Sequence, residues 1–141
     1  MPIDIEGWIE VKNDNSNEWV GVKHLSEYMI MADANSDYIF GITKIQRLNS
    51  VAGNRGLPND ISSQVATNIE DYREFEKEET NFYFDELFGF SFIIYDEVLK
   101  YELHDKLDKH SKWLDVFETM NKYFVKGYSA NNLRVVVWAN W

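Results

Sequence analysis

Cysteine is absent from this sequence of 141 residues, and proline occurs only twice. The lack of cysteine excludes disulfide frameworks, thiolate zinc sites and cysteine nucleophiles, and it fits a reducing compartment, so we expect a cytoplasmic protein. No apolar run approaches the roughly 18 residues that a membrane-spanning helix needs, and the first residues are acidic rather than basic. We therefore expect neither a membrane span nor a signal peptide.

Positive charge is also scarce, because 14 Lys and Arg residues stand against 24 Asp and Glu residues, for a net charge of −10. Affinity for nucleic acids comes mainly from basic side chains that displace counterions, so this charge disfavours nucleic acid as a partner. An acidic surface keeps a protein in solution, or it binds a partner that is itself basic. A chain of this length buries, on folding, roughly 68–70% of the surface that it exposes when unfolded. That is enough for a single domain without disulfides or a structural metal ion.

The sequence lacks the motifs of the common catalytic sites. Its three histidines, His24, His104 and His110, have no spacing typical of a metal site. The glycine-rich segment 53–56 lacks the Lys-Ser/Thr pair with which a Walker loop reaches phosphates and metal, and no nucleophile elbow occurs. We therefore predict no catalytic residues, no metal and no cofactor.

Three segments have the pattern of β-strands. Residues 7–11 and 18–22 alternate apolar and polar side chains around a turn-forming segment, 13–17, which predicts a β-hairpin. Residues 133–138 are β-branched and almost continuously apolar, which predicts a central strand that is buried on both faces beside the hairpin.

Helical periodicity occurs three times. It predicts a first helix at 36–48, a second after Ser62, and a third from Ser111 that stops at Gly127. Residues 80–95 fit either a strand or a helix, and 96–110 predict a short helix or a connection. The expected fold is α+β: a small antiparallel or mixed sheet, made of the N-terminal hairpin and the C-terminal strand, packed against about three helices that cover one side of it.

The loop at 54–60 is the most informative local feature. Arg55 offers a planar fork of donors suited to phosphate or carboxylate, Gly56 permits close approach of the backbone, and Pro58 stiffens the loop. Together these residues predict a site for an anionic ligand. The alternative is that Arg55 pairs with Asp60 or with another acid and only fixes a long connection.

Four short motifs resemble a known family. They are Asp4-Ile5-Glu6-Gly7-Trp8, Asp37-Tyr38-Ile39-Phe40, Arg55-Gly56-Leu57-Pro58-Asn59-Asp60 and Val135-Val136-Val137-Trp138-Ala139-Asn140. In order and spacing they resemble a family of small bacteriophage-encoded proteins, mostly of unassigned function. Many relatives carry a His-Ser-x-Ser-aromatic segment where this chain has 80–84, so any chemistry of those histidines would be missing here. The resemblance and the loop together give these candidate ligand-binding residues: Asp4, Tyr38, Arg55, Gly56, Leu57, Pro58, Asp60, Asn81, Tyr83, Trp138 and Asn140.

Three functional hypotheses follow. The first is a non-enzymatic phage accessory protein that binds and sequesters a small anionic, nucleotide-derived ligand such as a host immune signal, with Arg55 as the charge partner and aromatic rings as stacking platforms. It also allows a homo-oligomer that holds the ligand across a dimer seam. The second is an acidic inhibitor or decoy that binds a host protein. The third is a nucleotide or phosphodiester hydrolase.

Overall fold

The structure is a computed structural model that describes residues 3–42, 50–80 and 87–141. Within these ranges the chain forms one four-stranded sheet with the strand order β2-β1-β4-β3, in which every neighbouring pair is antiparallel. The strands are β1 (Asp4–Lys12), β2 (Trp19–His24), β3 (Leu87–Ile94) and β4 (Leu133–Asn140). Both the predicted α+β class and the predicted hairpin are confirmed.

The C-terminal strand β4 lies at the centre of the sheet, between β1 and β3. Its residues 133–139 are all buried, as their continuous apolar character predicts. At Gly7 of β1 the strands approach so closely that a Cβ atom would lie 2.1 Å from the carbonyl oxygen of Val136. Glycine is therefore required at this position.

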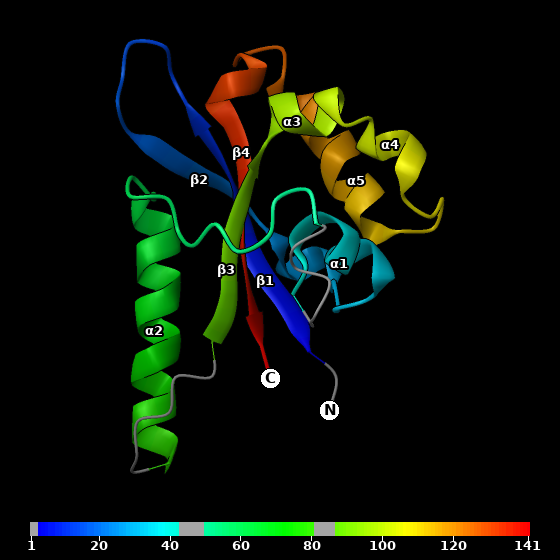
Figure 1. Cartoon of the computed structure of the whole chain (residues 1–141). Coiled ribbons are helices and arrows are strands. Elements are labelled where there is room, and N and C mark those ends of the chain that lie inside the picture. The colour runs from blue at the N-terminus through cyan, green and yellow to red at the C-terminus, as the bar shows by residue number, and fades with distance from the viewer. Residues whose placement is uncertain (1–2, 43–49, 81–86) are drawn as a thin grey trace.

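Helices cover both faces of the sheet (Figure 1), so the expectation that they cover one side is wrong. The long helix α2 (Ser63–Thr80) packs on the face that carries Val136 and Trp138. The opposite face, with Val135 and Val137, packs against the remaining helices. These are α1 (Ala34–Phe40), α3 (Tyr95–Lys100), α4 (Leu103–Lys106) and α5 (Lys112–Thr119). A central strand that is apolar on both faces needs both faces covered.

The first helix ends earlier than its periodicity predicts. Gly41 adopts a left-handed conformation, with φ at 58°, and its N–H donates to the carbonyl of Asp37 at 2.8 Å, which terminates α1 at Phe40. The cap is Asp33, whose side chain accepts from the N–H of Ser36 at 2.8 Å. A continuous helix over 36–48 is thus wrong, and residues 43–48 of that prediction lie outside the described residues.

The other two predicted helices are confirmed at their caps. Ser62 Oγ accepts from the N–H of Val65 at 3.2 Å, and Ser111 Oγ accepts from the N–H of Trp113 at 3.2 Å. After α5 the chain continues through a π-helical turn, Met120–Phe124, toward Gly127. Short 3₁₀ turns occupy Leu25–Tyr28 and Ala130–Asn132. Among the described residues, no helix has the length and apolar character needed to cross a membrane.

Candidate functional site

The guanidinium of Arg55 is bound to a carboxylate of the same chain. Its Nη1 and Nη2 each donate to one oxygen of Glu97 at 2.7 Å, and Nη1 also donates to the carbonyl of Phe92 at 3.2 Å. This bidentate hydrogen bond raises the pKa of Arg55 and lowers the pKa of Glu97. The side chain of Arg55 is 28% exposed. An external anion would have to compete with Glu97 for the same donors.

The backbone around Arg55 is attached to the outer edge of β3. The N–H of Gly56 donates to the carbonyl of Phe90 at 2.9 Å, and the N–H of Arg55 donates to Ser91 Oγ at 3.4 Å. Ser91 in turn donates to the carbonyl of Ala52. The loop therefore shields a sheet edge that would otherwise expose unpaired groups.

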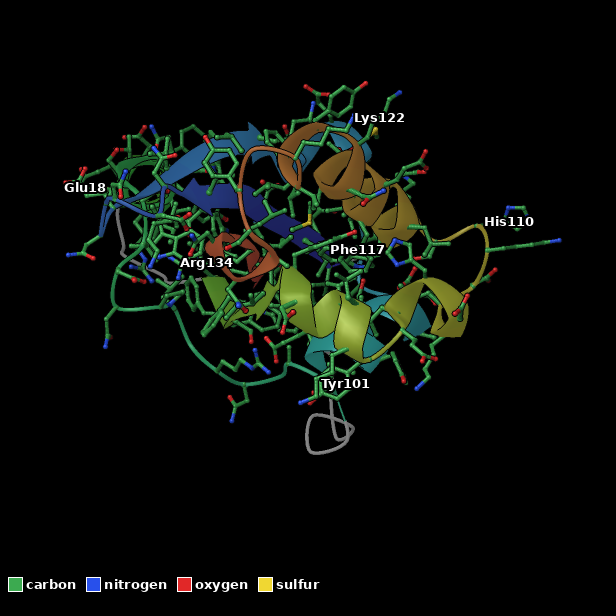
Figure 2. All side chains as sticks on the ribbon, turned by 90° about the horizontal axis from the view of Figure 1, so that it is seen from above. Glu18, Tyr101, His110, Phe117, Lys122 and Arg134 are labelled. Atoms are coloured by element: carbon green, nitrogen blue, oxygen red, sulfur yellow. The ribbon has the colours of Figure 1, made fainter. Side chains whose placement is uncertain are left out.

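The other end of the loop is held by a second arginine. Arg134 donates from Nε to Glu10 Oε1 at 2.6 Å and from Nη1 to Asp60 Oδ1 at 3.0 Å. Glu10 is fully buried and also accepts from the N–H of Ser62 at 2.7 Å, and Figure 2 shows Arg134 within the body of the molecule. Burial would raise the pKa of Asp60, but the hydrogen bonds from Arg134 and Trp19 outweigh it and leave that pKa lowered. Asp60 thus pairs with Arg134, not with Arg55.

The remaining predicted residues are dispersed. Trp138 is 2% exposed beneath α2, where it cannot stack on a ligand, and Asn140 accepts from the hydroxyl of Tyr72 at 2.8 Å. Tyr38 is exposed on α1. Leu57 packs on the apolar cluster under α2, and Pro58 is half-buried beside it. Asn81 and Tyr83 lie outside the described residues.

A hollow of about 350 Å³ lies beside Arg55 and is lined by Phe40, Gly41, Asn54, Arg55, Gly56, Gly89 and Phe90. Of the predicted ligand-binding residues, it brings together only Arg55 and Gly56.

A larger hollow, of about 460 Å³, lies between the sheet and α2. Trp8 and His24, which face each other on β1 and β2 with ring centroids 4.9 Å apart, line it from the sheet side. The helix contributes Ser63, Gln64, Thr67, Asn68 and Asp71. We call this hollow the α2 groove. Its volume falls in the range of ligand sites, roughly 300–1,000 Å³.

A carboxyl group lies next to the α2 groove. Glu6 Oε2 is 3.3 Å from His24 Nε2, a buried nitrogen that has no hydrogen-bond partner among the described residues. Burial raises the pKa of Glu6, against the attraction of His24. Glu6 thereby connects the α2 groove to a second hollow, of about 230 Å³, which it lines together with Asp4, Ile5, Ser26, Met29, Ile30 and Met31.

A third hollow, of about 270 Å³, shares Met29, Ile30 and Met31 with the second. It adds Asp33 and Asp108, and His110 at its rim projects outward from the connection between α4 and α5 (Figure 2). Met29 is 73% exposed. We call the three hollows together the acidic surface, because their described lining includes the carboxylates of Asp4, Glu6, Asp33, Asp71 and Asp108.

Sequence reasoning missed the acidic surface except for Asp4. One signal was present: Gln64, Asn68 and Asp71 recur at helical spacing beside the apolar stripe of α2 and mark a second, polar face. The contribution of Trp8 and His24 depends on strand register, which no local pattern shows.

Within the described residues, no group of three or more His, Asp or Glu side chains is placed to hold a metal ion. A scan against models of known protein families, a search of curated proteins and a search of solved structures each return no match. The resemblance to the bacteriophage family therefore stays a prediction.

Proposed function

We propose that this protein is a non-enzymatic binding domain that holds a basic segment of a partner protein along the acidic surface. The observation that carries the proposal is an asymmetry of charge. Arg55 and Arg134 form ion pairs with carboxylates of the same chain. The described lining of the acidic surface, by contrast, holds five carboxylates and a single lysine, Lys112. That lysine lines the third hollow, where its Nζ donates to the carbonyl of Met29 at 3.1 Å and keeps its positive charge.

The methionines suit the same partner. Met29 and Met31 expose flexible, polarizable side chains between the carboxylates, and such side chains adapt to different apolar surfaces. Carboxylates around them attract and orient a basic segment, which mainly raises the association rate and the specificity. A segment that combines Arg or Lys with Leu would meet both features.

A defined peptide of alternating Arg, Leu, Lys and Ala, labelled for fluorescence anisotropy, tests the proposal. We expect binding that weakens as salt is raised well above the roughly 0.15 M at which the Debye length is about 8 Å. Combining Asp4→Asn, Glu6→Gln and Asp33→Asn should lower the affinity about tenfold or more, since each rim charge contributes to steering. Asn at position 33 keeps an oxygen that can cap α1.

The matched control combines Asp96→Asn, Asp115→Asn and Glu118→Gln, three exposed acids on α3 and α5 outside the acidic surface. It removes the same charge and should leave the affinity within about twofold of the unmodified protein. Equal losses in the two triple variants would show that net charge alone attracts the peptide. That result, or no binding at low salt, would refute the proposal.

A second candidate function is capture of a small anionic, nucleotide-derived ligand beside Arg55, with a phage accessory role as its context. It is favoured by the hollow of about 350 Å³ in which Arg55 lies near Phe90 and Gly56. Because Glu97 competes for the guanidinium, Glu97→Gln should strengthen the binding of nucleotides several-fold in calorimetric titrations. If neither the unmodified protein nor Glu97→Gln releases or absorbs heat with nucleotides, capture is contradicted. If chromatography shows a product after incubation with a nucleotide, the protein is instead a hydrolase.

A further inference from the structure

We infer that the α2 groove is the seat for an arginine side chain of the bound segment, with the guanidinium on Trp8 and Asp71; the inference rests on the proposed function. The first support is that Trp8 is held in place. Its Nε1 donates to Asn68 Oδ1 at 2.8 Å. Trp8 and Gln64 also pack closely on Gly21: a Cβ atom added to that glycine would lie 3.0 Å from Trp8 Cε3 and 2.8 Å from Gln64 Cβ. The indole is thus fixed before any ligand arrives, which reduces the entropy lost on binding.

The charge in the groove has the required sign. Asp71 is exposed on the wall formed by α2, and Glu6 lies behind His24 at the end nearer the second hollow. Among the described lining residues there is no Lys or Arg to neutralise them. A cation over an indole ring near a carboxylate is stabilised by both groups.

The hydrogen-bonding groups of the groove favour a peptide over a free cation. The side-chain oxygens of Asn68 and Gln64 already accept, from Trp8 Nε1 and from the N–H of Gly21 at 3.0 Å. Their amide nitrogens therefore remain as donors, which a guanidinium cannot use because it has no acceptor. Backbone carbonyls on either side of an arginine supply those acceptors.

Arginine fits this site better than lysine. Its guanidinium is planar, so it stacks on an aromatic face and pairs with one carboxylate through two donors at once. Lysine presents a compact, strongly hydrated charge that gains less from the flat indole. The groove is therefore expected to discriminate between the two basic side chains.

Chemical-shift titration of the indole N–H of Trp8 tests the inference, with the resonance assigned through Trp8→Phe. The probes are N-acetyl-arginine-amide and the citrulline analogue, which has nearly the same shape but no charge. We expect the arginine probe to shift the resonance in a saturable way and the citrulline probe to shift it little. Asp71→Asn should weaken binding of the arginine probe about fivefold, whereas Asp115→Asn, on α5, should not.

A second pair of variants adds one positive charge on either side of α2. Thr67→Lys places it in the groove and should abolish the response, whereas Ala66→Lys places it on the neighbouring hollow and should preserve it. Equal shifts from arginine and citrulline, or equal losses in the two lysine variants, would overturn the inference.

The basic peptide separates this inference from the proposed function. If the peptide binds without moving the Trp8 resonance, the arginine site in the α2 groove is wrong and the proposed function stands. If the peptide does not bind, the proposed function itself fails.

Discussion

Two arginines hold the two ends of one loop, and their surroundings are opposite. Arg134 is 4% exposed and meets a fully buried Glu10 at the centre of the sheet, whereas Arg55 meets Glu97 at the surface with 28% of its side chain exposed. A buried charge that loses its partner stays desolvated, but an exposed one is rehydrated. The same pair of chemical groups should therefore contribute very differently to stability at the two ends.

The largest expected effect is at the buried end. Arg134→Met should lower the free energy of unfolding by about 3–5 kcal/mol, because it leaves the carboxylate of Glu10 buried without its cation. Urea denaturation followed by circular dichroism measures this. The double variant with Glu10→Leu should recover part of the loss, since the carboxylate that then lacks Arg134 is only that of Asp60, which is 54% exposed. A loss below about 1 kcal/mol in the single variant would contradict the assignment.

The exposed end should respond less. Arg55→Met should lower the free energy of unfolding by about 1 kcal/mol, because the bidentate pair is partly solvated. Lys109→Met, at an exposed lysine, is the control and should change stability by less than about 0.5 kcal/mol. If Arg55→Met proved as costly as Arg134→Met, solvent exposure would not be what separates the two sites.

Acid should weaken the exposed pair in a defined pH range. The hydrogen bond from Arg55 lowers the pKa of Glu97 in the folded state below its unfolded value of about 4.3. The pair therefore stabilises the fold fully above that value, and this contribution is lost as the pH falls through the folded pKa. Urea titrations between pH 7 and pH 3 should show a smaller acid-dependent loss in Arg55→Met than in the unmodified protein. Parallel curves would rule out this linkage.

Glu6 should give the smallest effect, with the opposite sign. Burial raises its folded pKa, so its contribution to stability is present below about pH 4.3 and is lost as the pH rises through the folded value. Glu6→Gln should therefore raise stability at pH 7 by a few tenths of a kcal/mol and leave it unchanged at pH 4. A loss of stability at pH 7 would mean that attraction between Glu6 and His24 outweighs the cost of burial.

The parts of the fold that were predictable have local causes. The caps Ser62 and Ser111 and the β-branched run of β4 act over a few residues, and the sequence shows them directly. The end of α1 was missed because Ile42 continues the apolar periodicity past Gly41, whose left-handed conformation decides the boundary. The type of β3 stayed open because its alternating Phe residues follow a turn-like segment.

The candidate site depended on contacts that are distant in sequence. The nearest acid in the Arg55 motif is Asp60, yet Arg55 pairs with Glu97 because β3 and α3 bring that carboxylate to the loop. Trp8 faces His24 only because the β1–β2 register shifts between Ile9 and Glu10. Neither the Arg55–Glu97 pair nor the Trp8–His24 pair can therefore be predicted from the spacing of residues within a motif.

The central position of β4 has a consequence for biosynthesis. Residues 133–140 leave the ribosome after all the other described strands, yet β1 and β3 touch each other only through them. Until then the emerging chain holds an N-terminal hairpin and an unpartnered strand, and a lone hairpin is marginal in water. The four-stranded sheet therefore forms only after β4 has been translated, because β3 has no other neighbouring strand among the described ones.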